Sequence, residues 1–393
     1  MKKLITLVGG LLVSCAALFA VDESQLFNAV EAKDLRRVNN YIYANANQLF
    51  KQGGKSMTAF QLAVENQDKI IADALLSDGN ADVNADFGVE PPLFIAIRNN
   101  DSEMIELLVN HGANVNAPFK NTVPIIYAIT NGGGNGGDMI RTIIRAAKNN
   151  NQNINLTYRD LDGRNALDYA VTGGSFLSGQ ATAGVDVVNE ILQISGSDNL
   201  FKSQDRTGNT PVHWCVKGGA NVVIFKRLMA RPIAAECCNI LNNDGFTPLA
   251  LFLYQTESQQ NHVAWEVLNA FLSVPGFKMS SMAMPKNYGG DNGIFRLIRM
   301  GASSERDLLN CLKTITRNDK TLASFQDETG EPMLCIAIDE EWNPAIVEFL
   351  IDNYKGDWQK LRKSGRGGKN AIEIMRANHS EDLYQDIFDK YMN

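Results

Sequence analysis

Apolar and polar positions recur along this chain in a pattern that predicts short helices in pairs. A glycine, one further residue, a capping residue and a small residue or proline precede each run of apolar residues. The clearest copies are 163–170, 208–215, 245–252 and 330–337. Because successive copies are separated by about 32 to 45 residues, the spacing is that of a helix-pair repeat with insertions.

The residue types in each copy fit the start of a helix. A threonine such as Thr210 can cap exposed backbone N–H groups, and Pro211 at the first helical position loses no intrahelical hydrogen bond. A second helix with one apolar face follows, as at 104–108, and Gly112 suits the left-handed position that ends it. Asn116 and its equivalents are expected to bond the local backbone in the turn.

No single helix pair of this kind buries its apolar side, whereas stacking on neighbouring pairs does. The pattern therefore predicts an all-α fold, a solenoid of about ten stacked helix pairs with β-turn or hairpin-like connections. In these repeated segments the sequence resembles the ankyrin repeat, whose signature is T-P-L-H-x-A. Residues 86–117 are the clearest whole unit, 74–85 match the end of another, and the resemblance extends over roughly 22–393.

The first twenty residues are typical of a secretory signal peptide. Lys2 and Lys3 precede an apolar run from Leu4 to Val13, which small residues follow up to Ala20. Two processing routes stay open. Cleavage after Ala20 gives a plain secreted protein, whereas the segment that ends at Cys15 resembles a bacterial lipoprotein box with Cys15 as the lipid anchor. No later run is long and apolar enough to span a bilayer.

The remaining chain, 21–393, is predicted to be one solenoid without an inter-domain linker. Residues 21–50 are expected to form an N-terminal capping repeat and 366–393 a C-terminal one, since end repeats need a polar outer side. The closing helix over 380–393 would place Leu383, Ile387 and Tyr391 on one face.

Charge and cysteine content narrow the function further. The formal net charge is −7, which disfavours binding of nucleic acid because a phosphate backbone needs a clustered positive surface. Six cysteines in 393 residues, one of them Cys15, do not make a disulfide scaffold, although one or two bridges would be compatible with export.

Motifs with known chemistry are present only in fragments. Gly132, Gly134 and Gly137 match a dinucleotide-binding pattern, but they join two predicted helices and follow no strand. Residues 160–163 have too few oxygen ligands for a calcium loop and fit the turn before a helix. The histidine of the repeat signature, His213, is expected to make turn hydrogen bonds, as the resemblance implies. We therefore predict no catalytic residue, no cofactor and no metal.

Insertions interrupt the repeat at four places, namely 131–137, 172–184, 255–261 and 274–290. An enzyme or metal-dependent factor that uses the loops around 255–290 is the alternative to a binding scaffold.

The resemblance implies that turn tips and the ends of the first helices line a concave groove that binds a protein partner. Arginine and aromatic side chains dominate the energy of such interfaces. The residues at these positions are Arg98, Phe119, Lys120, Arg164, Arg206, Lys217, Phe246 and Tyr254. The prediction is an exported, non-enzymatic scaffold, periplasmic or at the cell surface or extracellular, and charge reversal at Arg164 and Arg206 should weaken binding without changing the melting temperature.

Overall fold

A computed structural model describes most of the chain after the first 22 residues. The described residues are 23–52, 54–131, 136–172, 185–217, 221–258, 265–274, 278–290, 292–300, 305–318, 325–327, 329–354, 357–362, 368–378, 380 and 382–391. The predicted signal peptide, with Cys15, lies outside them. The chain divides after Leu200 into two compact units, which we describe separately as unit 1 and unit 2.

Unit 1 consists of helix pairs and one β-hairpin. A helix over residues 23–31 precedes α2 (Leu35–Asn40), and the antiparallel strands β1 (Leu49–Gln52) and β2 (Lys55–Thr58) pair Leu49 with Thr58 and Gln52 with Lys55. The helices that follow are α3 (Ala59–Glu65), α4 (Lys69–Ser77), α5 (Pro92–Arg98), α6 (Ser102–Asn110), α7 (Pro124–Asn131), α8 (Gly136–Asn149), α9 (Ala166–Thr172), α10 (Val185–Gln193) and the 3-10 helix η2 (Ser197–Leu200).

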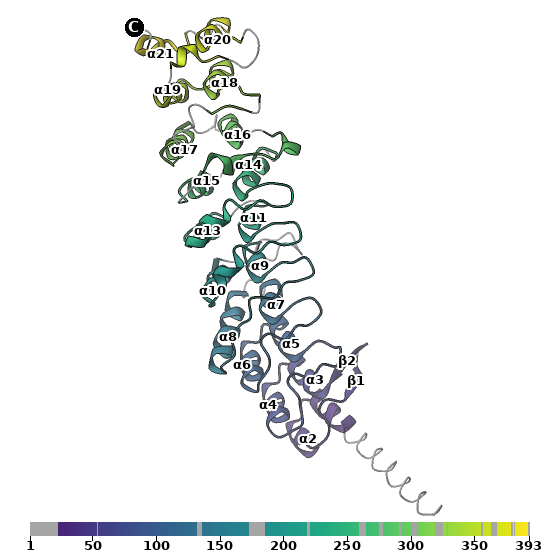
Figure 1. The fold of residues 1–393 in the computed structure, drawn as a ribbon. Coiled ribbons are helices and arrows are strands. Elements are labelled where there is room, and N and C mark those ends of the chain that lie inside the picture. The colour runs from purple at the N-terminus through teal and green to yellow at the C-terminus, as the bar shows by residue number, and fades with distance from the viewer. Residues whose placement is uncertain are drawn as a thin grey trace, which may run out of the picture. The chain divides into compact units, whose positions relative to one another are not determined.

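The helices of unit 1 form two layers (Figure 1). The first helix of each pair packs on the first helix of the next, from α3 through α5 and α7 to α9, and the second helices α4, α6, α8 and α10 do the same. Side chains such as Phe94, Ile97 and Leu108 are buried between these layers. This arrangement agrees with the predicted stacking of helix pairs within this unit.

Unit 2 repeats this construction. Its elements are α11 (Pro211–Val216), α12 (Val222–Met229), α13 (Pro232–Cys237), α14 (Pro248–Ser258), α15 (Trp265–Leu272), η3 (Met279–Met282), η4 (Lys286–Tyr288), α16 (Gly293–Met300), α17 (Glu305–Asn318), α18 (Met333–Asp339), α19 (Pro344–Asn353), η7 (Trp358–Lys360), α20 (Ala371–Ala377) and α21 (Gln385–Tyr391). First helices again pack on first helices, as α11 on α14 and α14 on α16, and second helices on second helices, as α12 on α15.

The helix ends are formed by the residues that the pattern indicates. Thr58 and Gln61 make a capping box at the start of α3, in which each side chain bonds the backbone N–H of the other. Asp68 and Asp101 cap α4 and α6 through a bond from the third helical N–H. The connections from α3 to α4 and from α5 to α6 are therefore short and specified locally.

The turn asparagines act over a longer range than we expected. Asn116 was predicted to bond its own turn, but its side chain bonds the backbone of the next repeat: Nδ2 donates to Asn153 O and Oδ1 accepts from Asn155 N, both at 2.8 Å. Asn84 bonds Gly112 O and Asn114 N in the same way, also at 2.8 Å. These bonds join consecutive connections of unit 1, and only a stacked structure brings the partners together.

Two elements of unit 2 differ from the sequence prediction. Pro232 cannot continue α12 because it has no N–H, and it begins the additional helix α13. Near the C-terminus, residues 382–384 form a turn before α21, so Leu383 is 45% exposed. The adjacent Tyr384 is buried instead, and its hydroxyl donates to Trp342 O at 2.7 Å.

Candidate functional site

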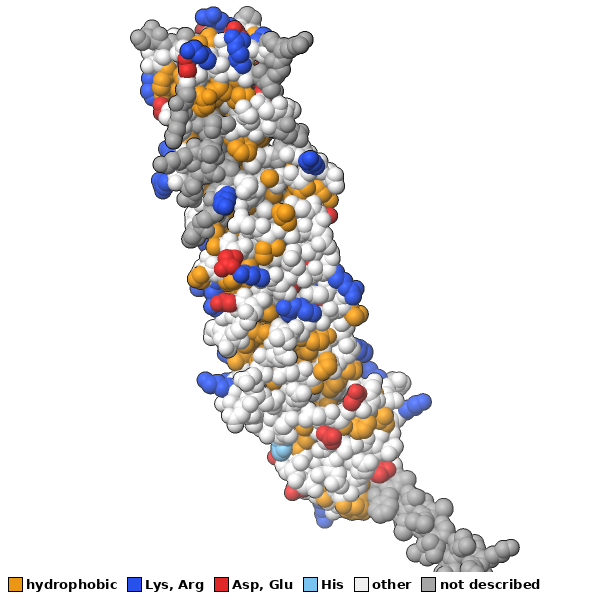
Figure 2. All heavy atoms as spheres, viewed as in Figure 1, with side chains coloured by type: hydrophobic (Ala, Val, Ile, Leu, Met, Phe, Trp, Pro, Cys, Tyr) orange, Lys and Arg blue, Asp and Glu red, His pale blue; other side chains and the backbone are white. Residues whose placement is uncertain are grey.

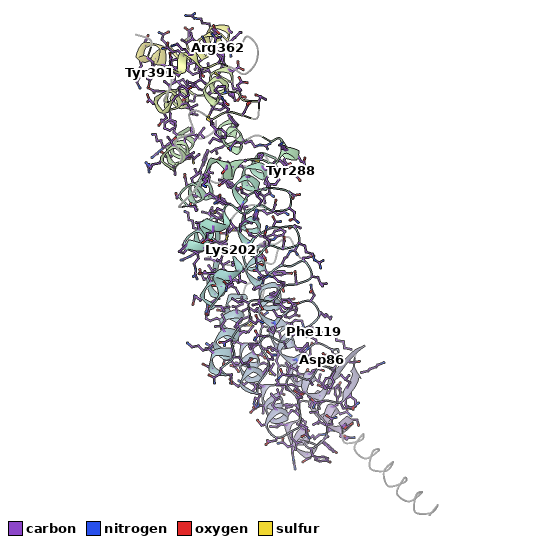
Figure 3. All side chains as sticks on the ribbon, in the orientation of Figure 1. Asp86, Phe119, Lys202, Tyr288, Arg362 and Tyr391 are labelled. Carbon is purple, nitrogen blue, oxygen red and sulfur yellow. The ribbon has the colours of Figure 1, made fainter. Side chains whose placement is uncertain are left out.

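The predicted binding residues lie on one side of the helix pairs in each unit. We define the turn face of unit 1 as the turns 86–90, 118–122 and 160–164 with the exposed parts of α5, α7 and α9. The turn face of unit 2 is the turns 205–209, 242–246 and 285–288 with the exposed parts of α11, α14 and α16. Figure 3 labels Asp86 and Phe119 on the former and Tyr288 on the latter, and Figure 2 shows apolar and cationic side chains exposed next to one another.

An aspartate or asparagine side chain builds the turns 160–164, 205–209 and 242–246. Asp205 Oδ1 accepts the backbone N–H groups of Thr207 and Asn209, both at 2.9 Å, and Asn242 accepts those of Asp244 and Phe246. Asp160 does the same in unit 1, which confirms that 160–163 is a turn before a helix. A glycine with a positive φ completes these three turns, as Gly208 does at +76°.

Arg98 is held in an ion-pair network at the end of α5. Its guanidinium lies 2.6 Å from Glu65 Oε2 and 3.2 Å from Glu90 Oε2. The hydroxyl of Tyr127 donates to Glu90 Oε1 at 3.1 Å, and burial together with the negative charge of Glu90 raises the pKa of Tyr127 to about 12. Beside this network, β2 residues such as Met57 line a cavity of about 250 Å³ with α3, α5 and Glu90.

Phe119 and Lys120 form the neighbouring turn. The Phe119 ring contacts Phe94 edge-on, with 5.5 Å between the ring centroids, and Phe94 also contacts Tyr127 at 5.0 Å. Lys120 is exposed, and its ammonium lies 5.2 Å from the centroid of Phe119. These two residues are accessible, as a binding role requires.

Arg164 lies deeper than the sequence suggested. Its side chain is 19% exposed, and its guanidinium is 3.1 Å from Asp162. The neighbouring Tyr169 hydroxyl donates a hydrogen bond to Asp160. Burial raises the pKa of Tyr169, and this hydrogen bond raises it further. Reversing the charge of Arg164 would place like charges together in a turn, so the variant would lose stability as well. Arg164 is therefore unsuited to a test that needs an unchanged melting temperature.

In unit 2, Arg206 and Lys217 are exposed. Arg206 is at the tip of the turn 205–209. Lys217 follows α11, and its ammonium lies 4.6 Å from the Trp214 ring. The Trp214 indole donates to Asp205 Oδ2 at 3.0 Å, so the same carboxylate holds both the turn and the ring that Lys217 covers.

Phe246 is not a surface residue, contrary to our expectation. It is 2% exposed, because its ring is covered by Tyr254 at 5.2 Å and by Tyr288 at 4.8 Å between centroids. Tyr254 is half-buried, with Arg296 5.5 Å from its ring centroid. The buried Phe246 ring therefore packs against the inner side of both tyrosine rings, and a partner would contact Tyr254 and Tyr288.

Sequence reasoning missed several side chains of these faces. Tyr127, Tyr169 and Trp214 all occupy the fourth position of a first helix, and each bonds a carboxylate. This recurrence is a signal that could have been found. Tyr288 and Arg296 lie where the repeat pattern is weakest, so only their packing on Tyr254 reveals them.

His213 has the structural role that the resemblance implied. Its side chain is buried, with Nδ1 3.2 Å from Thr210 N and Nε2 3.0 Å from Phe246 O, and burial lowers its pKa to about 4. His111 lies 2.9 Å from Asp73 on the second helices, while His262 and His379 are outside the described residues. Across the described ranges, no group of three or more His, Cys, Asp or Glu side chains could hold a metal ion.

The cysteines beyond residue 22 are buried and form no disulfide with one another. They are Cys215, Cys237, Cys238, Cys311 and Cys335. Burial raises the pKa of Cys215, Cys238 and Cys311 to about 12 and that of Cys237 to about 11, so these thiols are poor nucleophiles at neutral pH. The adjacent pair Cys237 and Cys238 packs at the end of α13.

The insertions are described only in part. Gly132 and Gly134 lie outside the described residues, whereas Gly137 is buried in α8. The segment 278–290 forms η3 and η4, and η3 packs on α14. In the part of the chain that the structure covers, no helix has both the length and the apolar character needed to cross a bilayer.

Comparisons with known proteins agree with the repeat at the N-terminal end. Residues 26–119 match the family model for ankyrin repeats in three copies. A putative ankyrin repeat protein of Fowlpox virus (strain NVSL), FPV022, is 30% identical over 110 residues, which cover 28% of this chain and 18% of that protein. The chain thus spans less than a fifth of the length of this relative. Residues 26–119 are therefore similar to three ankyrin repeats.

Proposed function

We propose that this chain is a non-enzymatic scaffold that binds a protein partner through its turn faces. The observation that carries the proposal is the gathering of part-exposed arginine, lysine and aromatic side chains on turns in front of ankyrin-type helix pairs. Ankyrin repeats typically mediate protein–protein interaction, and Arg, Tyr and Trp are the residues that contribute most at interfaces. The repeat number of about ten, which extends beyond residues 26–119, is part of this proposal.

The proposed site of action is outside the cytoplasm, in the periplasm, at the cell surface or in the medium. Lys2, Lys3 and the apolar run after them support export, and lipidation at Cys15 is the alternative to plain secretion. The burial of the five described thiols is compatible with an oxidising compartment, because a buried thiol with a raised pKa reacts slowly.

Affinity capture from envelope extracts tests the interaction. The wild-type chain is compared with Arg206→Glu/Lys217→Glu, which reverses two exposed charges on the turn face of unit 2. Arg227→Glu/Lys313→Glu serves as a matched control, since Arg227 and Lys313 are exposed on the second helices α12 and α17.

We expect mass spectrometry to identify a protein that the wild type and the control retain and that the turn-face variant loses. Equal capture by all three chains would remove this face from the binding site. Release of the mature chain by osmotic shock would support plain secretion, whereas labelling with a fatty acid would support anchoring at Cys15.

A further inference from the structure

Three consecutive turns of unit 2 form one continuous surface. Asn243 of the second turn donates from N to Thr207 O at 3.0 Å and from Nδ2 to Arg206 O at 2.9 Å, which joins the first and second turns. The second and third turns are in contact as well: a Cβ atom added to Gly245 would lie 3.4 Å from Pro285. Side chains on these turns can therefore contact a single ligand.

This surface carries three cations that form no ion pair with an acidic side chain of the described residues. Arg206, Lys217 and Lys286 are exposed, and within the described ranges none of the three is within salt-bridge distance of a carboxylate. Asp205 precedes Arg206, but it is 7% exposed and its two oxygens accept the turn N–H groups and the Trp214 indole, while the exposed Asp244 of the second turn is within salt-bridge distance of none of the three cations. The positive charges of this surface are thus available to a ligand.

Two other exposed cations of unit 2 contrast with these. Lys202, labelled in Figure 3, lies in the turn after η2 and pairs with Glu236, and Lys226 of α12 pairs with Glu266 of the following helix pair. The two arginines on the turn face of unit 1 also have acidic partners, as Arg98 has in Glu65 and Glu90. These ion pairs stabilise the packing of the helix pairs, whereas Arg206, Lys217 and Lys286 on the turn face of unit 2 form no such ion pairs in the described residues.

Aromatic rings lie among the unpaired cations. Tyr254 and Tyr288 meet edge-on, with centroids 5.3 Å apart, and both are part-exposed above the buried Phe246. The Arg296 guanidinium covers Tyr254 and donates to Tyr288 O at 2.9 Å, so it is fixed next to both rings. An extended ligand could place an apolar or aromatic side chain on these rings while its carboxylates meet the cations.

We propose that the turn face of unit 2 binds an acidic peptide segment that contains an aromatic residue. The inference rests on the proposed function and names the chemistry of the partner at this face. Polynucleotides fit less well, because a long polyanion needs an extended positive surface and the chain as a whole has a net charge of −7. A short acidic segment needs only the local cluster.

The probe for this proposal is a fluorescein-labelled random copolymer of glutamate and tyrosine, measured by anisotropy with the full chain. We expect the wild type to bind it and the affinity to fall at least about tenfold in Arg206→Glu/Lys286→Glu, with a steep dependence on salt. Arg227→Glu/Lys313→Glu is the matched control, and we expect it to bind as the wild type does. Thermal unfolding of each variant verifies that the fold is retained.

Three results would overturn the proposal: no binding of the copolymer, equal binding by Arg206→Glu/Lys286→Glu and by the control Arg227→Glu/Lys313→Glu, or tighter binding of a lysine–tyrosine copolymer. An oligothymidylate that competes at equal concentration would also overturn it, in favour of a nucleic-acid ligand. If envelope capture still yields a partner that depends on this face, the scaffold function stands and only the acidic class is lost.

Discussion

The Nε2 atom of His213 lies 3.0 Å from the carbonyl oxygen of Phe246, 33 residues later in the chain. Its Nδ1 atom accepts from the backbone N–H of Thr210, so the ring joins its own helix start to the turn of the next repeat. Gln61 makes the same pair of contacts in unit 1: Oε1 accepts from Thr58 N and Nε2 donates to Glu90 O, both at 2.9 Å. An amide and a neutral imidazole thus perform one structural task.

This equivalence predicts the outcome of two substitutions. His213→Gln should unfold with a free energy within about 1 kcal/mol of the wild type, because the amide can replace both hydrogen bonds. His213→Ala should lose about 2 to 4 kcal/mol, since it leaves a cavity and two unpaired backbone groups. Urea unfolding followed by circular dichroism measures both values, and similar losses in the two variants would contradict the assignment.

Acid conditions probe the same residue. Burial lowers the pKa of His213 to about 4, while the unfolded chain keeps the ordinary value of 6.5. As the pH falls from 6.5 towards 4, only the unfolded chain takes up the proton, so stability decreases by up to about 3 kcal/mol. His213→Gln should lack this part of the pH dependence. Parallel stability curves of the two chains between pH 7 and pH 4.5 would show that His213 is not held neutral.

Alanine substitution of two glycines distinguishes the cost of backbone strain from the cost of losing contact between two turns. Gly88 and Gly208 have φ values of +70° and +76°, but an added Cβ meets nothing within 4 Å at Gly88 and lies 2.5 Å from Asn243 Oδ1 at Gly208. Gly88→Ala should therefore cost about 1 kcal/mol from strain alone. Gly208→Ala should cost about 3 kcal/mol or more, because it also separates the two turns. Equal costs in thermal unfolding would argue against contact between these turns.

The asparagines between repeats make a further prediction. Asn116→Ala removes one hydrogen bond to Asn153 O and one to Asn155 N. We expect the free energy of unfolding to fall by about 1 kcal/mol or less, because both hydrogen bonds are exposed to solvent. Amide hydrogen exchange at Asn155 should become faster. Asn149→Ala, an exposed residue at the end of α8, is the control. Unchanged exchange at Asn155 would mean that the bond does not persist in solution.

Thiol labelling measures the burial of the cysteines. In a Cys15→Ser background, the five remaining thiols should react slowly with Ellman's reagent at pH 8 and rapidly in guanidinium chloride, because all five are buried and burial raises the pKa of Cys215, Cys237, Cys238 and Cys311. Ser77→Cys places one exposed thiol on α4 as a reference for fast reaction. Native wild-type thiols that react at the rate of this reference would refute the burial of these side chains.

The helix pairs and their starts were predictable from the sequence. Caps such as Thr58, prolines such as Pro211 and left-handed glycines such as Gly112 act within a few residues of the backbone that they stabilise. The apolar spacing that defines each helix face is equally local. Such signals can be read from the chain because the interacting groups are close in sequence.

The candidate site was predicted only at the level of position. The turns and helix ends were correctly located, and Lys120, Arg206 and Lys217 are exposed there. Whether a side chain is free depends on what lies against it. Tyr288 covers Phe246 from a segment about 40 residues away, and Glu65 of the preceding repeat pairs with Arg98, which also pairs with Glu90 of its own repeat.

The sequence by itself thus determined the repeating unit, its helices and its turns, because these follow from contacts within one repeat. Only the tertiary structure decided which of the turn-face side chains are exposed, which asparagines join neighbouring repeats and which cations remain unpaired. The physical reason is that burial and charge pairing are properties of surfaces brought together by stacking. Their partners lie about one repeat apart, where no local pattern specifies them.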